Sequence, residues 1–246
     1  ALQEIGTLKA LKRLFPDDQY ETLFSPRWSN IDPEEGQGDV YTGIAIRKGA
    51  GVSIVERRDL TSLSVTHSDG KRTRAGTGAL LEFDGNQFWF LSVHLKSSCP
   101  KTKKIHKSPP GHCQTLWTQG GILADWIAEK RTAEIPFVVA GDFNRHFRRL
   151  EDKGPFWKAL NGVVPDGEIE TPFLIKFPAK AIRDCPTRKG KSSQPIDWFL
   201  LDNRYPDVFV EGSFWERRYT QVDKIDAQNG KGLSDHCPIS IDIGFK

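Results

Sequence analysis

The chain has 246 residues, of which 37% are hydrophobic and 27% charged, and its net charge is +3. These values are typical of a soluble globular protein with a sizeable core, and no apolar run is long enough to span a bilayer. The weak positive charge allows a polyanionic partner without indicating one. The chain contains no Met and opens at Ala1 on an apparent strand end. We therefore expect a trimmed or processed chain, and no signal peptide is visible.

The first half of the chain predicts one short helix among several strands. Residues 2–5 have the pattern of a strand end that carries Glu4, and Thr7 can cap a short helix with an apolar face. A polar, proline-containing surface loop is expected at residues 25–38. Further strands are expected at residues 40–47, 52–55, 60–66, 80–83 and 88–95. The last two flank Asp84-Gly85-Asn86, a strong hairpin signal.

The second half predicts one long helix and a set of strands. A polar loop at residues 96–113 precedes an amphipathic helix at residues 114–131. The apolar, β-branched run at residues 137–140 predicts a buried strand that stops at Gly141. Helical or irregular structure is expected at 145–160, a loop at 170–194, and strands at 196–201, 208–214 and 238–243. Because no repeat or linker interrupts the chain, we expect one domain, residues 1–246, with a mixed α/β fold.

Two polar residues directly follow the buried strand. Asp142 and Asn144 are two positions apart, so in extended backbone their side chains face the same way. A carboxylate beside an amide at the mouth of a rigid strand can bind a metal ion or a water together with a phosphate oxygen. The alternative is an ordinary turn, since Gly, Asp and Asn are common turn residues.

Other acids and histidines also lie at predicted strand ends: Glu4, His94, Asp197, Asp235 and His236. Each one alone could be a capping, surface or hydrogen-bonded strand-end residue. Together they provide what metal-assisted phosphoester hydrolysis requires. Oxygen ligands suit a hard cation such as Mg²⁺, and a cation with an imidazolium can neutralise charge in the transition state. A histidine oriented by a carboxylate keeps one tautomer and a raised basicity.

Four motifs in this order resemble the endonuclease/exonuclease/phosphatase superfamily: Leu2-Gln3-Glu4, Gly141-Asp142-Phe143-Asn144, Ile196-Asp197-Trp198-Phe199-Leu200 and Ser234-Asp235-His236-Cys237-Pro238-Ile239. This is the group of deoxyribonuclease I, the exonuclease III-type abasic-site endonucleases and the neutral sphingomyelinases. The resemblance runs from the first residues to the last strand. It implies a deoxyribonuclease I-like, four-layer sandwich of two mixed β-sheets flanked by helices, with the site at one edge of the sheets.

The resemblance also implies metal and water-activating roles. Glu4 matches the metal-binding acid and Asp235 an acid near the metal, with Mg²⁺ as the expected ion and Mn²⁺ as an alternative. Asp142 matches the residue that orients or deprotonates the attacking water. His236 matches the essential histidine, and Asp197 matches its carboxylate partner.

Three further matches concern the phosphate and the leaving group. Asn144 matches a phosphate-contacting amide. Tyr41, in the stretch at residues 40–45, resembles a phosphate-contacting tyrosine of the abasic-site endonucleases, and its alternative is an ordinary strand aromatic. His94 resembles the histidine of the deoxyribonucleases and sphingomyelinases, which favours a general-acid role. The family's first strand, with an Asn that helps to hold the metal, precedes Gln-Glu. This chain starts too late to contain it, so one metal ligand is expected to be missing.

These matches predict a divalent-metal-dependent phosphodiester hydrolase, most simply an endonuclease that acts on DNA. The alternatives are a phosphatase or sphingomyelinase-type phosphodiesterase on a small or lipid substrate, and a non-catalytic binding module with the same fold. We expect a monomer without a membrane span. Four basic residues could neutralise DNA phosphates, although each could equally be a solvated surface charge: Lys101, Lys103, Lys104 and Arg145.

The four cysteines bear on the compartment. Cys99 and Cys113 lie in the one long loop, and a disulfide between them would stabilise the fold by about 3 kcal/mol through loop closure. Cys237 begins a core strand and is expected to be a buried free thiol, whereas Cys185 has no evident mate. The bridge would indicate a periplasmic or secreted protein. The alternative is a cytoplasmic enzyme with four reduced thiols.

Overall fold

The computed structural model describes residues 1–26, 39–147, 154–168, 170–178, 195–205, 208–217 and 236–245. Three residues named above lie outside these ranges: Cys185, Ser234 and Asp235. Within them, the element order is mixed α/β, and none of the helices is long and apolar enough to cross a lipid bilayer.

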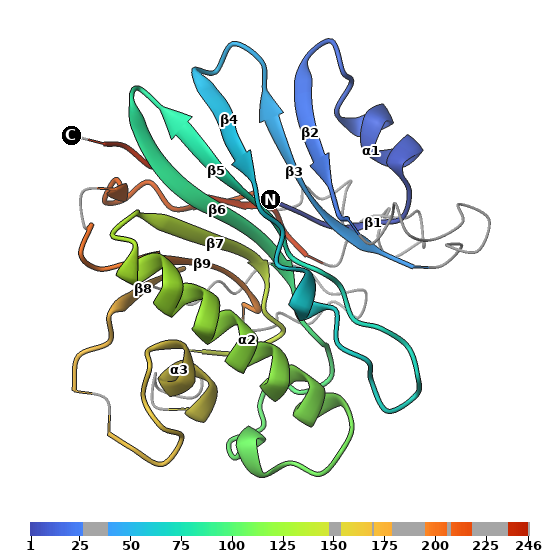
Figure 1. Cartoon of the computed structure of the whole chain (residues 1–246), viewed down its shortest axis with the longest axis vertical. Helices are drawn as coiled ribbons and strands as arrows, with labels where there is room; N and C mark the ends of the chain where they lie inside the picture. The colour runs from blue at the N-terminus through green and yellow to red at the C-terminus, as the bar shows by residue number, and fades with distance from the viewer. Residues whose placement is uncertain are drawn as a thin grey trace.

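A six-stranded sheet forms the centre of the molecule (Figure 1). Its strands lie side by side in the order β4-β5-β6-β7-β9-β8. β6 and β7 are parallel, and the other pairs are antiparallel. The bounds are β4 Val52–Arg57, β5 Thr77–Phe83, β6 Asn86–His94, β7 Phe137–Asp142, β8 Leu174–Phe177 and β9 Asp197–Asp202. The parallel pair needs a long crossover, which the helix α2 (His112–Thr132) provides.

Two smaller antiparallel sheets complete the strands of the described residues. β1 (Leu2–Ile5), β3 (Tyr41–Arg47) and β2 (Tyr20–Phe24) form one sheet in that order. β10 (Trp215–Glu216) pairs with β11 (Ile239–Ser240). The sheet of β1 to β3 faces the central sheet, since Ile44 and Ile46 of β3 pack in one apolar cluster with Ala79 and Leu81 of β5.

The alternation of side chains along the central strands separates two cores. Trp89, Leu91 and Val93 of β6 pack with residues of α2 and of the helix α3 (Pro155–Leu160), which cover one face. Phe88 points to the opposite face, toward the smaller sheet. A third cluster joins Leu11 of the helix α1 (Leu8–Leu14) to the outer side of that smaller sheet. The result is the expected four-layer sandwich: helices, central sheet, smaller sheets and α1.

Several local predictions were wrong, for identifiable reasons. Residues 60–66 form a 3₁₀ turn at Thr61–Leu63 with isolated antiparallel bridges at Leu60 and Thr66, rather than a continuous strand. The Leu63 carbonyl accepts from the side chains of Thr73 and Gln119. Residues 208–214 make only an isolated bridge, from Phe209 to Ile243. The short edge strand β8 lies within a segment that the sequence predicted to be a loop.

The cysteines gave one correct and one wrong prediction. Cys99 and Cys113 form a disulfide, with their Cα atoms 5.3 Å apart. Cys237 is not a free thiol: it is disulfide-bonded, and the other half of that bond lies outside the described residues. The side chain is 6% exposed, and burial alone does not distinguish a core thiol from half of a disulfide.

Candidate active site

Three of the predicted site residues lie in one row across the central sheet. His94 ends β6 and is in register with Asp142 at the end of β7, which in turn is in register with Asp197 at the start of β9. By the alternation of the strands, all three side chains point to the face opposite α2, as do Ala140 and Phe199, which are paired with each other two residues further along β7 and β9. Strand ends that are distant in sequence are thus brought to one edge of the sheet.

The chain immediately after β7 locks the Asp142 carboxylate. The backbone N–H of Asn144 donates to Oδ1 at 2.7 Å, and the Asn144 side-chain amide donates to Oδ2 at 2.8 Å and to the Leu95 carbonyl at 3.0 Å. This turn needs Gly141, which has φ +140°: a Cβ there would lie 2.1 Å from the Val93 carbonyl oxygen. Asn144 itself has φ +52°, a conformation that Asn tolerates better than most residues. Asp142 and Asn144 therefore form one rigid unit.

A histidine from the C-terminal segment completes the row. Nδ1 of His236 lies 2.6 Å from Oδ2 of Asp197, and both side chains are partly exposed. A carboxylate at this nitrogen fixes the tautomer with the proton on Nδ1 and leaves Nε2 directed elsewhere. The predicted pairing of the essential histidine with its carboxylate partner is present in the structure.

The strand β1 brings Glu4 to the same place. Its carboxylate, which is 58% exposed, lies 4.0 Å from Nε2 of His94, and that nitrogen is 3.5 Å from Oδ2 of Asp142. Ser92 ties β1 to β6, accepting from the Gln3 amide at 3.2 Å and donating to the Leu2 carbonyl at 3.0 Å. Glu4 has φ +58°, which costs energy for this residue type and marks a position under constraint.

Burial dominates the electrostatics of the row. It raises the pKa of the Asp142 carboxyl well above its usual range, and the charge of Asp197 adds to this. Burial also lowers the pKa of His94 to about 3, with smaller contributions from the charges of Arg74, His236 and Lys96. His94 is therefore neutral at pH 7, and its contact with Asp142 is not an ion pair.

The site fits a divalent metal ion. Among the described residues, Asp142, Asp197 and His236 each offer a ligand atom, and these atoms lie within 4.8 Å of one another. A carboxylate that is buried beside a second carboxylate is costly to ionise without a cation nearby. In addition, Nδ1 of His94 is buried and has no hydrogen-bond partner among the described residues. The donor set of oxygens with one imidazole suits a hard or borderline cation.

A comparison with known families agrees with this geometry. The sequence profile of the Endonuclease/Exonuclease/phosphatase family matches residues 1–236. The chain belongs to this family. Its members are phosphoesterase and nuclease hydrolases that generally use divalent metals, so the protein is a hydrolase of ester bonds. No curated protein sequence matches the chain significantly.

Solved structures of the endonuclease/exonuclease/phosphatase type share the fold at low sequence identity. The mannosyl-6-phosphatase of Bacteroides thetaiotaomicron VPI-5482 is 15% identical, with a TM-score of 0.57 over 99% of this chain and 84% of that chain. A humanized D. rerio TDP2 is 14% identical, with a TM-score of 0.57 over 99% and 84%. The human Nocturnin catalytic domain is 15% identical, with a TM-score of 0.52 over 98% and 79%. At this identity the likeness concerns the fold alone.

Two residues that the sequence analysis assigned to substrate contact, Tyr41 and Arg145, have buried side chains. Tyr41 is 1% exposed and packs with Leu11 and with Phe24, whose ring centroid is 5.4 Å away, so the alternative of a strand aromatic describes it better. Arg145 was expected to bind nucleic acid, but its side chain is fully buried and donates to the carbonyls of Cys99 and Thr102. The burial of these two side chains does not favour substrate contact, and sequence position alone does not say which side of a strand or turn faces solvent.

The remaining basic candidates are three lysines, and their proposed role in binding DNA stays a prediction. Lys101, Lys103 and Lys104 are exposed on the loop between β6 and α2. The sequence reasoning missed Arg74 and Lys96, whose charges act on His94 and on each other. Lys96 could have been found, because it follows His94 by two positions and extended backbone directs both side chains to one side. A cavity of about 450 Å³ opens beside the hydrogen-bonded pair of Asp197 and His236, which we call the dyad. Its lining includes Ala1, Leu2 and Phe199.

Proposed function

We propose that the protein is a divalent-metal-dependent phosphodiester hydrolase that acts as an endonuclease on DNA. The observation that carries this proposal is the row of His94, Asp142 and Asp197, with His236 bonded to Asp197. It brings the Asp142 carboxylate, held by Asn144, and the Asp197–His236 pair to one edge of the sheet. Hydrolysis of a phosphodiester needs both a group that accepts the proton of water and one that assists the departing oxygen.

The proposed metal site uses Glu4, together with Asp235, which lies outside the described residues. Mg²⁺ is the proposed ion and Mn²⁺ the alternative, because carboxylate oxygens predominate in the donor set. When bound, the ion would neutralise negative charge on the reacting phosphate.

The chain's own residues account for the proton transfers. Asp142, held by two hydrogen bonds from Asn144, orients the attacking water and accepts its proton. His236 donates from Nε2 to the departing oxygen, because the Asp197 carboxylate stabilises its imidazolium form. His94 is held neutral and serves as a hydrogen-bond donor to a phosphate oxygen. Asn144 is the proposed phosphate contact of the turn.

Plasmid nicking by the full-length protein with Mg²⁺, with and without EDTA, tests this function. We expect nicking that chelation abolishes and that added Mg²⁺ restores, because uncompensated charge on the phosphate would otherwise oppose attack. Parallel assays follow phosphate release from sugar phosphates and headgroup release from phospholipid vesicles. If the protein hydrolyses these substrates in a chelator-sensitive way and does not nick the plasmid, its substrate is a small or lipid phosphoester and not DNA.

A second candidate function is supported by the cavity beside the dyad. Its volume of about 450 Å³ is in the range of sites that enclose a small molecule. One structural neighbour is titled a mannosyl-6-phosphatase, so a sugar phosphate is the small substrate to test first. The cations near His94, Arg74 and Lys96, would attract the phosphate group of a sugar phosphate as well as that of DNA. The exposed lysines, in contrast, favour DNA, which has many phosphates.

The three exposed lysines provide the second test of a DNA substrate. Changing Lys101, Lys103 and Lys104 together to alanine should reduce the slope of log K against log salt by roughly 0.9 for each phosphate that these side chains neutralise. The measurement is fluorescence anisotropy of a labelled duplex at several salt concentrations. A matched control removes three exposed cations on the far layers, Lys9, Arg13 and Arg47. If both triple variants and the wild type have the same slope, the three lysines do not contact DNA phosphates and belong to an ordinary solvated loop.

We also propose that residues 1–246 act as one monomeric catalytic domain in the periplasm or outside the cell. Two disulfides support the location, since such bonds rarely persist in the cytoplasm: Cys99–Cys113 and the bond of Cys237. Alkylatable thiols at Cys99 and Cys113 in freshly isolated protein would contradict it.

A further inference from the structure

Arg145 directly follows the site residue Asn144 and is an unusual buried cation. Its side chain is fully buried, and burial lowers its pKa to about 10, which still leaves it charged at neutral pH. Within the described part of the chain, no carboxylate forms an ion pair with it, and its Nε has no partner. The guanidinium instead donates to two backbone carbonyls, that of Cys99 at 2.5 Å and that of Thr102 at 3.2 Å. These carbonyls, together with the Phe156 ring whose centroid lies 5.6 Å from Cζ of the guanidinium, compensate the buried charge.

The same segment is bonded to the site on its other side. The Arg145 carbonyl accepts from Nε1 of Trp198, the residue after Asp197, at 2.8 Å. The next residue, His146, donates its backbone N–H to the Pro100 carbonyl at 3.1 Å. Arg145 thus links the loop that starts at Cys99 to Asn144 by the chain and to the Asp197 strand by a hydrogen bond.

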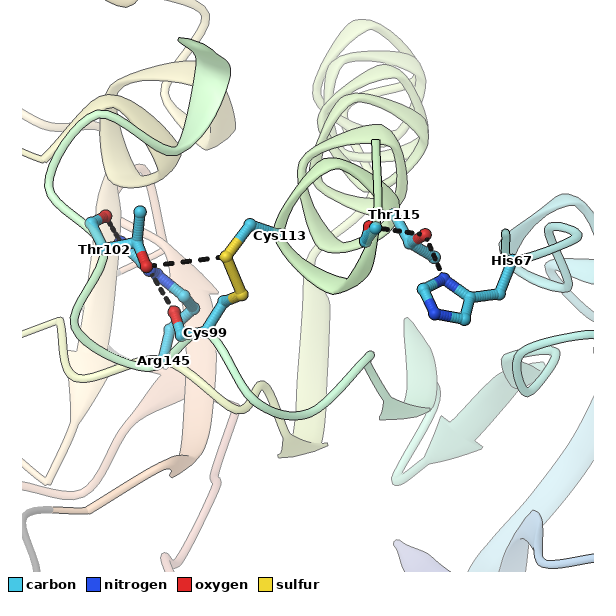
Figure 2. The surroundings of a disulfide bond; sticks show 7 residues. His67, Cys99, Thr102, Cys113, Thr115 and Arg145 are labelled. Carbon is cyan, nitrogen blue, oxygen red and sulfur yellow. Dashed lines mark hydrogen bonds between the residues drawn. A yellow bond between two sulfur atoms is a disulfide. The ribbon is translucent and has the colours of Figure 1, made fainter. Parts of the chain in front are cut away.

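The disulfide makes this loop a rigid support. It joins Cys99 to Cys113 in the first turn of α2, as Figure 2 shows, and the Thr102 hydroxyl lies 3.5 Å from the Cys113 sulfur. The other side of that turn is fixed by a hydrogen bond of 2.8 Å between Nδ1 of His67 and Oγ1 of Thr115 (Figure 2). The Cys99 and Thr102 carbonyls are consequently held against a long helix rather than on a free loop.

We propose that the disulfide-closed loop of residues 99–113, acting through Arg145, positions Asn144 and Asp197 for catalysis, so that full activity requires the oxidised cysteine pair. Without the bridge, the loop can move and the guanidinium loses the carbonyls that compensate its charge. A desolvated cation then gains free energy by reaching water, and it carries the backbone beside Asn144 with it. A displacement of about 1 Å at reacting groups can cost about 100-fold in rate.

The test uses two changes that act on the same link. Arg145→Met keeps the side-chain volume and removes the donors, and the double variant C99A/C113A opens the loop while leaving every donor in place. Each is expected to lower kcat by 10-fold to 100-fold with KM changed by less than twofold. Hydrogen exchange of peptides covering residues 142–147 should be faster in both. The double variant also separates this disulfide from the one at Cys237, which a reducing agent would break as well.

Arg131→Met is the matched control. Arg131 also donates to a backbone carbonyl and to Asp202, and its guanidinium lies over the Phe173 ring. Asp202 is at the opposite end of β9 from Asp197, about 17 Å away at about 3.3 Å per residue. The control should lower the melting temperature and leave both kcat and the exchange of residues 142–147 unchanged. If Arg145→Met does not fold, the kcat and the hydrogen exchange of the double variant C99A/C113A still test the proposal.

Wild-type kcat and unchanged exchange in C99A/C113A would overturn the inference. The assays use bis(p-nitrophenyl) phosphate as well as DNA, because the inference rests on the site of the proposed function but not on its substrate. If the wild type cleaves the small ester and not DNA, the proposed function fails and the ester still tests Arg145. The exchange measurement requires no substrate, so it gives a result in every case.

Discussion

Changing Asp142 to asparagine is expected to lower kcat by about 10⁴-fold, since loss of a positioned acid–base group alone costs about 10²–10⁴-fold. The residue is 5% exposed, and both of its oxygens accept from Asn144. An asparagine would turn an N–H₂ group toward one of these donors, so the proposed base and the geometry of the turn would be lost together. Steady-state hydrolysis of the preferred ester with saturating Mg²⁺ measures the effect.

The same substitution has a second, opposite effect on stability. Because burial raises the pKa of Asp142 in the folded state, the metal-free folded protein binds more protons than the unfolded chain as the pH rises from about 4. Its stability therefore falls with pH over this range through Asp142, and an asparagine removes that loss. In EDTA, the melting temperature of the variant minus that of the wild type should therefore rise with pH, whatever the loss of the turn costs at every pH. Asp84→Asn, in the exposed hairpin turn with φ +51°, is the control and should change neither rate nor pH dependence.

Removal of His236 is the second change with a large expected effect. His236→Ala and Asp197→Asn should each lower kcat by about 10³-fold, because the carboxylate holds the imidazole through a hydrogen bond of 2.6 Å and positioned proton transfer is worth about 10²–10⁴-fold. Two residues that act as one unit give non-additive losses, so the double variant should be little worse than either single variant. Steady-state kinetics of all three variants check this.

A suitable control for the Asp197–His236 pair is a second carboxylate that lies next to a histidine, but outside the site. Asp166 is exposed, and its Oδ1 lies 3.6 Å from Nε2 of His106. Asp166→Asn should therefore retain wild-type turnover. Near-normal activity of His236→Ala would show that the assignment of the site is wrong, whereas additive losses in the double variant would show that His236 and Asp197 act separately.

The sequence was sufficient to predict that His94, Asp142 and Asp197 lie together, because their positions follow from the strands. Asp142 comes at the end of an apolar run and His94 at the end of another, and parallel neighbouring strands bring such ends together. The helix predicted at residues 114–131 is present as α2, since a repeated apolar face over many residues leaves little ambiguity. The resemblance of four short motifs supplied the layer arrangement, which periodicity alone does not give.

The parts that could not be predicted depend on contacts between distant segments. Nothing next to Arg145 in the sequence shows that its guanidinium ends on the carbonyls of residues 46 and 43 positions earlier. Tyr41 lies on β3, and which face of that strand is covered depends on α1, which packs against it only in the folded chain. The same holds for Cys237, whose bonding depends on a distant cysteine.

The disulfide between Cys99 and Cys113 also bears on when the protein becomes active in the life of the cell that makes it. A newly synthesised chain in reducing surroundings carries two thiols at these positions, and a disulfide donor must accept their two electrons and two protons to close the loop. On our proposal, Arg145 gains its fixed partners only then. On the same proposal, the newly made chain would work at about a tenth to a hundredth of its full rate until the bond has formed.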